Sequence, residues 1–143
     1  MDSIRACISF QASAAAKVIT RMSRAALAPH GVTPIQFAVL QAVSEVGDPT
    51  AAEIGATLMI DSATIVGVID RLVALALMTR VADPADRRIY RLSLTPRGRE
   101  ALPAMQAAMD GVNAEVDDAL GASAAGVRAS LRDLALLQNV AKE

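Results

Sequence analysis

Residues 83–98, DPADRRIYRLSLTPRG, decide the fold of this 143-residue chain. The stretch opens with turn-forming aspartate and proline, and two arginines make the turn basic. Polarity then alternates with the period of a strand over residues 89–94, which predicts that Tyr90, Leu92 and Leu94 share the inward face. Thr95-Pro96 is typical of a helix start. The stretch therefore predicts a β-hairpin, paired through residues 79–81, that leads directly into a helix.

Two short helices are expected immediately before this hairpin. Thr50 and Glu53 form a capping box that opens a helix ending near Leu58, and Asp61 or Ser62 begins the next helix, which ends near residue 76. Two short helices and a tight turn, followed by a basic hairpin, make a winged helix-turn-helix. Such a fold places a helix in the major groove of DNA and arginines in the minor groove. The inward stripe of the second helix is expected to comprise Ile65, Ile69, Leu72 and Leu75 or Ala76.

Longer helices are predicted on both sides of this region. They cover residues 3–28, 33–46 (opened by Thr33 and Gln36), 96–120 and 123–141 (capped by Ser123). The first and last helices carry apolar stripes that a monomer of this size would leave wet, which favours a homodimer. We expect residues 1–32 and 96–143 to be dimerisation helices and residues 33–95 to be the DNA-binding domain. The two stripes are Ile4, Ile8, Ala15, Val18, Met22 and Ala25, and Val127, Leu131, Leu134 and Gln138.

Composition agrees with a helical regulator whose charge is unevenly distributed. Hydrophobic residues make up 53% of the chain and aromatic residues only 2%, which favours helices over sheets. The net charge of −1 does not by itself indicate nucleic acid. However, residues 79–99 hold six arginines and two aspartates, whereas residues 101–143 hold three basic and six acidic residues. The predicted hairpin therefore lies in a basic patch.

Several other classes of protein are not expected. With Cys7 as the only cysteine and His30 as the only histidine, we expect no metal site, no cofactor and no internal disulfide, and we expect a cytoplasmic setting. No apolar run approaches the roughly 20 residues of a membrane span, so we expect no membrane partner. The chain also lacks a glycine-rich phosphate loop and a Gly-x-Ser-x-Gly elbow, so we expect a regulator and not an enzyme.

Three stretches in this order and spacing resemble the MarR family of winged helix-turn-helix transcriptional regulators. They are residues 32–40, residues 61–72 and the hairpin with its exit at residues 83–98. The resemblance covers nearly the whole chain, and it implies a mainly α fold with a small β-hairpin wing and an intertwined homodimer. It also implies binding to a near-palindromic DNA operator, with half-sites about 34 Å apart, and commonly repression released by a small molecule.

The resemblance also assigns DNA-binding roles. Arg87 matches the wing arginine that enters the minor groove, Asp86 matches the acidic residue that braces the wing, and Arg88 is a phosphate or bracing candidate. Gly67 stands where some family members carry a base-reading side chain, so we expect fewer direct base contacts. The remaining candidates are Ser62, Ala63, Thr64 and Arg71 on the recognition helix, and Thr33 and Thr50, whose capping roles explain them without DNA.

The signal that controls DNA binding is expected to be a small molecule, and an aromatic acid is one possibility. An anionic ligand would need a cation such as Arg21, Arg24 or His30. Two alternatives stay open: an oxidant-sensing regulator acting through Cys7, and a winged-helix module that binds protein and not DNA. The candidate effector-pocket residues are Ala15, Arg21, Met22, His30, Phe37, Met59, Met105 and Met109.

Overall fold

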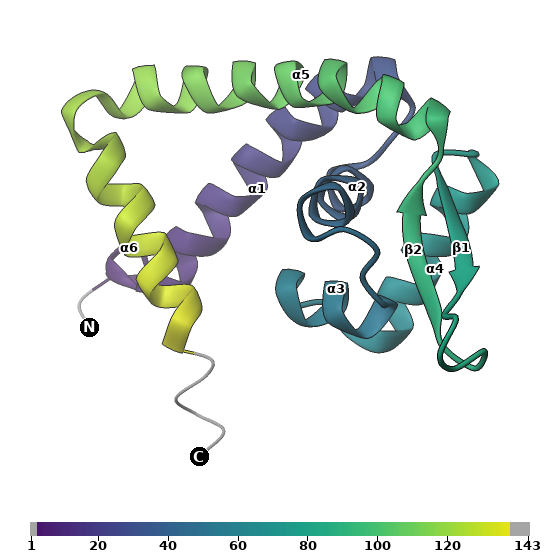
Figure 1. Ribbon diagram of the computed structural model, residues 1–143. Coiled ribbons are helices and arrows are strands. Elements are labelled where there is room, and N and C mark those ends of the chain that lie inside the picture. Colours follow the sequence, from purple (N-terminus) through teal and green to yellow (C-terminus); the bar gives the residue numbers. More distant parts are fainter. Residues whose placement is uncertain (1–2, 138–143) are drawn as a thin grey trace. The chain divides into compact units, whose positions relative to one another are not determined.

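A computed structural model describes residues 3–137 (Figure 1). The chain divides into two compact units, Met1–Met109 and Asp110–Glu143, and each is considered by itself. The mainly helical fold with one β-hairpin confirms the predicted winged helix-turn-helix class. In chain order the elements are η1 (Ile4–Ala6), α1 (Ile8–Leu27), η2 (Ala28–His30), α2 (Pro34–Val46), α3 (Ala51–Leu58), α4 (Ser62–Ala74), β1 (Met78–Ala82), β2 (Tyr90–Leu94), α5 (Pro96–Leu120), η3 (Gly121–Ser123) and α6 (Ala124–Leu136).

The starts of the three DNA-binding helices agree with the sequence. In the capping box of α2, the Thr33 backbone N–H donates to the Gln36 side chain at 2.8 Å. In that of α3, the Thr50 backbone N–H donates to the Glu53 carboxylate at 2.7 Å. Asp61, and not Ser62, is the N-cap of α4. These caps satisfy amides that the first helical turn leaves without partners, so they fix where each helix begins.

The core of the first unit is formed by α2, α3, α4, the hairpin and the start of α5. The strands pair antiparallel, with Met78 opposite Leu94 and Ala82 opposite Tyr90. Leu92 and Leu94 point inward as predicted, whereas Tyr90 is 54% exposed because it lies at the end of the hairpin beyond the core. Side chains from every one of these elements are fully buried, among them Leu40, Ile54, Ile65, Ile69, Leu72, Met78, Leu92 and Met105.

The junction between the hairpin and α5 explains why threonine and glycine occur at positions 95 and 98. Thr95 donates a hydrogen bond from its hydroxyl to the Ala76 carbonyl at 2.7 Å and accepts one from the Gly98 amide at 2.9 Å. A Cβ added at Gly98 would overlap the Leu77 carbonyl oxygen. The first turn of α5 therefore lies directly on the backbone that precedes β1, and only glycine fits at this position.

Two turns around α4 use left-handed backbone at residues other than glycine. Met59, between α3 and α4, has a φ of 54°, and Ala76, after α4, has a φ of 56°. The predicted inward positions Leu75 and Ala76 are both exposed, because α4 ends at Ala74 and the chain turns away there. Leu77 and Met78 are buried in their place.

The N-terminal helix differs from its prediction. A separate 3-10 turn, Ile4–Ala6, comes first, and Cys7 has extended backbone before α1 begins at Ile8. The stripe along α1 is also not buried by the described residues, since Ile8 is 69% and Val18 46% exposed. Only Ser23 and Leu27 of α1 are buried.

The second unit contains the end of α5 and the helix α6. Arg128 of α6 binds Asp117 of α5 at 2.8 Å, which links the two helices of this unit. Ser123 precedes α6 but makes no side-chain capping bond, contrary to the prediction. Val127, Leu131 and Leu134 are between 37% and 52% exposed, and Gln138 lies outside the described residues.

No single helix in the described part of the chain is long and apolar enough to cross a membrane. Helices α3 and α4 have that length and composition only as a pair, bent by 114°.

The Gly98 contact generates a prediction about stability. Gly98→Ala should lower the free energy of unfolding by about 1–3 kcal/mol, because the new methyl group overpacks a backbone carbonyl. Urea denaturation measures the change. Gly111→Ala is the matched control: it also replaces a glycine within α5, but with open space around the new Cβ. It should raise stability by about 0.5–1 kcal/mol, and a Gly98 variant as stable as the native chain would refute the packing argument.

Candidate nucleic-acid interface

Helices α3 and α4 form a helix-turn-helix. A three-residue turn, residues 59–61, joins them at 114°. This is the geometry in which the second helix of such a motif enters the major groove. Figure 1 shows α3 at the same end of the first unit as the tip of the hairpin, with α4 passing behind the strands.

The N-terminus of α4 is exposed and rigidly capped. Ser62, Ala63 and Thr64 all lie at the surface. The Asp61 carboxylate accepts hydrogen bonds from the Thr64 amide at 2.8 Å and from its hydroxyl at 2.6 Å. These hydrogen bonds from Thr64 lower the pKa of Asp61. The Thr64 hydroxyl thus has a structural partner, which sequence reasoning did not predict.

A hollow of about 260 Å³ lies between the start of α2 and the recognition helix α4. It contains four of the predicted DNA-binding positions besides Thr64: Thr33, Ala63, Gly67 and Arg71. The Arg71 guanidinium has no ion-pair partner within residues 3–137. Its neighbour Asp70 instead binds Arg80 of the wing at 2.5 Å. Arg71 is therefore the cation of α4 that a phosphate or base can reach.

The wing tip is organised around one buried carboxylate. Asp83, only 8% exposed, accepts hydrogen bonds from the Ala85 amide at 2.8 Å and the Asp86 amide at 3.3 Å. Its other oxygen accepts from the Arg91 Nε at 2.6 Å. The Arg91 pair, first, and the amide of Ala85 hold the pKa of Asp83 below its usual value. The tip is thus a defined turn and not a loose loop.

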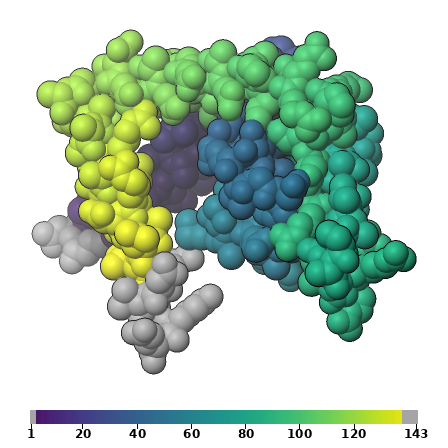
Figure 2. All heavy atoms as spheres, in the orientation of Figure 1, coloured from purple at the N-terminus to yellow at the C-terminus, as the bar shows by residue number. Residues whose placement is uncertain are grey.

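The two arginines of the tip have different surroundings. Arg88 binds the Asp86 carboxylate through two guanidinium nitrogens, at 3.0 and 2.9 Å, so the structure pairs Asp86 with a neighbouring arginine. Arg87 is exposed and forms no ion pair among the described residues. In Figure 2 the atoms of this tip, in green, stand out from the rest of the first unit. Arg87 is therefore exposed without an ion pair in the described part of the chain, while Arg88 is held by Asp86.

Arg91 is the important residue that sequence reasoning missed. It binds Asp83 in the wing tip and also donates to the Asp48 carbonyl at 3.1 Å, just before α3. Leu92 adds a backbone bond to the Pro49 carbonyl at 2.8 Å. The wing is thus fastened to the N-terminal end of α3. The available signal was an arginine on an otherwise alternating strand, eight residues after an aspartate.

The predicted effector residues do not gather at one place within the first unit. Met105 is buried in the core, Met109 and Phe37 pack against that core, and Met59 is 58% exposed in the turn before α4. Ala15, Arg21, Met22 and His30 lie along α1 and η2. Of these, Arg21 lines an open pocket along α1.

Cys7 lies at the N-cap of α1 and is partly exposed. Its thiol lies 3.5 Å from the Ser9 hydroxyl. The Ser9 hydroxyl, first, and the amides of Phe10 and Ser9 lower the pKa of Cys7. Among the described residues, no cluster of three or more His, Cys, Asp or Glu side chains is arranged to hold a metal ion.

Comparison with known proteins agrees with this geometry. Residues 30–89 match the MarR family. The chain is 37% identical to the HTH-type transcriptional regulator YsmB of Bacillus subtilis over 87 residues. This match covers 61% of this chain and 60% of YsmB. The chain is 31% identical over 136 residues to the HTH-type transcriptional regulator TtmR of Methylorubrum extorquens, covering 91% of this chain and 70% of TtmR. The first three curated relatives are matched over only 47–60% of their length.

Solved structures extend the similarity over nearly the whole chain. A crystal structure of a probable transcriptional regulator from Pseudomonas aeruginosa has 31% identity and a TM-score of 0.87, covering 92% of this chain and 99% of that one. BpsR of Bordetella bronchiseptica, whose DNA binding is regulated by 6-hydroxynicotinic acid, has 25% identity and a TM-score of 0.87, covering 94% and 97%. The repressor CouR of Rhodococcus jostii, bound to a 23-mer DNA duplex, has 26% identity and a TM-score of 0.83, covering 99% and 96%.

The fold, the capped recognition helix and the basic wing define a winged helix-turn-helix protein. The chain belongs to the MarR family of transcriptional regulators.

The wing tip generates a prediction about charge. A carboxylate whose pKa is lowered by folding stabilises the folded form above its unfolded pKa of about 4, and this contribution is lost as pH falls through the lower folded pKa. We expect the amide NMR signal of Ala85, which donates to Asp83, to titrate below about pH 4. Asp83→Asn should abolish that titration and lower DNA affinity about tenfold, the loss expected for one charge-assisted hydrogen-bond network. Asp86→Asn, which breaks a more exposed pair, is the control and should have a smaller effect; equal losses would contradict the central role of Asp83.

Proposed function

We propose that this protein is a homodimeric repressor that binds a near-palindromic DNA operator and is released by a small aromatic acid. Operator DNA would place its action in the cytoplasm. The observation that carries the proposal is that this member of the MarR family presents both an exposed wing arginine, Arg87, and an exposed outward face of the predicted recognition helix, α4. CouR, a relative of similar length and fold, is a repressor that binds duplex DNA.

The geometry of the wing supports DNA and not protein as the partner. Arg80, Arg88 and Arg91 are each bound to an aspartate, which fixes the hairpin and neutralises those charges. Within the hairpin and α4, Arg87 and Arg71 are the cations that form no ion pair among residues 3–137, so they can meet phosphates or a groove. Phosphate neutralisation by arginine dominates the affinity of such proteins and makes it depend on salt. A winged helix that bound only protein would not need this division of charges.

A dimer is supported by the apolar surface at the two ends of the chain. Ile8 and Val18 on α1 and Leu131 and Leu134 on α6 are each more than 40% exposed. Leaving these stripes in water is unfavourable, and contact with a second copy would bury them. A two-fold dimer would present two recognition helices to half-sites about one helical turn of DNA apart.

The test of DNA binding uses Arg87. Arg87→Ala should weaken binding and reduce the slope of log affinity against log salt by about one unit for each arginine that contacts phosphate. Fluorescence anisotropy over a salt series, with DNA flanking the encoding gene, gives both quantities. Arg132→Ala, which removes the same charge from α6, is the matched control and should leave the slope unchanged. If the slope is the same in the Arg87 variant and the native chain, Arg87 does not contact phosphate, and the proposed role of the wing is wrong.

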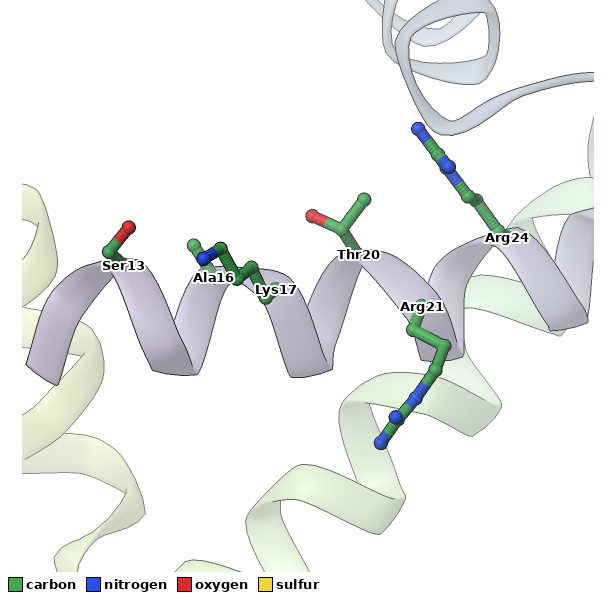
Figure 3. A pocket seen from close by; sticks show the side chains of 6 residues that line it. All are labelled: Ser13, Ala16, Lys17, Thr20, Arg21 and Arg24. Carbon is green, nitrogen blue, oxygen red and sulfur yellow. The ribbon is translucent and has the colours of Figure 1, made fainter. Parts of the chain in front are cut away.

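An acidic effector is supported by the charge of α1. No acidic residue occurs between residues 3 and 44, while this segment contains Arg5, Lys17, Arg21 and Arg24. An open pocket of about 410 Å³ lies along α1 and is lined by Ser13, Ala16, Lys17, Thr20, Arg21 and Arg24. In Figure 3 Ser13, Thr20 and Arg24 extend from one side of the helix, and Arg21 extends from the other. A small carboxylic acid would complement Arg24 and the two hydroxyls, which share one side of the helix, while Lys17 and Arg21 add positive charge to the lining.

The effector test is a thermal-shift assay with hydroxylated aromatic acids, including 6-hydroxynicotinic acid. A ligand present at about 100 times its Kd stabilises the native state by about 2.7 kcal/mol, which raises Tm by several degrees. Arg24→Ala or Arg21→Ala should reduce that shift, and Arg132→Ala should preserve it. If both pocket variants keep the full shift, the acid binds elsewhere.

Control by oxidation through Cys7 is the second candidate, favoured by one observation. The Ser9 hydroxyl, first, and the amides of Phe10 and Ser9 lower the pKa of its thiol, and a larger thiolate fraction raises reactivity toward peroxide. Peroxide treatment beside the acid screen separates the two candidates, because oxidative release of DNA must disappear in Cys7→Ser whereas release by an acid must not.

A further inference from the structure

The outward face of α4 has an unusual composition for a helix that reads DNA. Ala63, Val66, Gly67 and Asp70 are spaced so that they share one face, opposite the buried Ile65, Ile69 and Leu72. All four are exposed, and Val66, a branched apolar side chain, is 47% exposed. The centre of the reading surface is therefore apolar.

Two of the hydrogen-bonding groups near this face are already engaged, whereas Ser62 lies at its N-terminal end and Arg71 at its edge. Asp70 is bound to Arg80 at 2.5 Å, and the Thr64 hydroxyl donates to Asp61 at 2.6 Å. Arg71 lies beside the face, in the hollow against α2. Direct reading of guanine uses Arg or Lys, adenine uses Asn or Gln, and cytosine uses Asp or Glu, whereas thymine is read by apolar contact with its C5 methyl group. The groups that Val66 and Ala63 offer suit thymine.

Gly67 adds an independent indication of close contact. It lies inside α4, where glycine is less favourable than alanine by about 0.5–1 kcal/mol. A Cβ added at Gly67 would meet nothing within 4 Å, so packing within the chain does not require glycine there. Glycine in such a place is explained when the helix backbone approaches another molecule closely.

We propose that α4 reads thymine C5 methyl groups in the major groove, with Val66 as the contacting side chain and Gly67 as the point of closest approach. The inference rests on the proposed DNA-binding function and names the base class that the operator presents to α4. In this proposal, base specificity comes from apolar contact with Val66, and Arg71 contacts the DNA beside the thymine.

The experiment begins with the full-length chain and a random pool of DNA duplexes, from which bound sequences are selected. Each thymine of the selected half-site is then replaced by deoxyuridine, which removes only the C5 methyl group. At the thymine under α4 we expect about fourfold weaker binding per half-site, the value of one buried methyl-sized group. If no duplex is selected, the proposed function itself fails. If duplexes are selected and no deoxyuridine substitution weakens binding, only this inference fails.

The contact is assigned to Val66 by a double-mutant cycle. Val66→Ala should bind the native site more weakly and should lose most of the additional penalty from deoxyuridine. Val46→Ala is the matched control, since Val46 is 53% exposed at the end of α2, and it should retain the full penalty. An unchanged penalty in the Val66 variant would overturn the assignment.

Close approach at Gly67 is tested by a substitution that should change stability and DNA affinity in opposite directions. Gly67→Ala should raise the free energy of unfolding yet weaken binding to the selected duplex about tenfold, the scale of an overpacked contact. Gly111→Ala should stabilise the chain similarly and leave affinity unchanged. Affinity that is retained in the Gly67 variant, or lost equally in both variants, would overturn the close-approach argument.

Discussion

The position of the wing depends on the double attachment of the Arg91 guanidinium. One nitrogen binds the buried carboxylate of Asp83, which shapes the wing tip, and another binds the carbonyl of Asp48, which precedes α3. A hairpin of two five-residue strands is marginally stable by itself in water. By joining the tip to the residues before α3, this side chain holds the wing against the helix-turn-helix.

A second link connects the same two parts. Asp70 on α4 binds Arg80 on β1, and Ser93 on β2 hydrogen-bonds Asp48. These pairs are partly exposed, so each contributes little stability alone. Their main effect is on the orientation of the hairpin. Asp70 and Arg80 restrict how the hairpin tilts against α4, and Ser93 and Asp48 hold it to the loop before α3. The arginines of the hairpin therefore divide into those that hold its shape and Arg87, which forms no ion pair within residues 3–137.

Features that local chemistry determines were predictable from the sequence. The capping boxes at Thr33 and Thr50, the order of elements and the hairpin with its helix exit follow from residues that lie within a few positions of one another. Inward Leu92 and Leu94 follow from strand alternation, which did not hold for Tyr90 because the hairpin extends beyond the core there. The break at Cys7 was not predicted, since the apolar period runs through it without interruption.

Features that depend on contacts distant in sequence were not predictable. Arg91 and Asp48 are 43 residues apart, and Asp70 and Arg80 meet only once the hairpin is docked. The role of Gly98 also appears only when α5 is placed against Leu77. Sequence patterns indicated that the hairpin was basic, but only coordinates show which of its charges are neutralised and which are offered to a partner.

The left-handed residues on either side of α4 have a consequence for evolution. Non-glycine residues in this conformation cost roughly 1–2 kcal/mol each, so Met59 and Ala76 sit at positions where glycine would relieve the backbone. Glycine would also let the recognition helix swivel at both ends. With a side chain at each of these two positions, folding is less favourable but the orientation of α4 is more tightly restricted. Related proteins with glycine at these positions should therefore bind a broader range of DNA sequences.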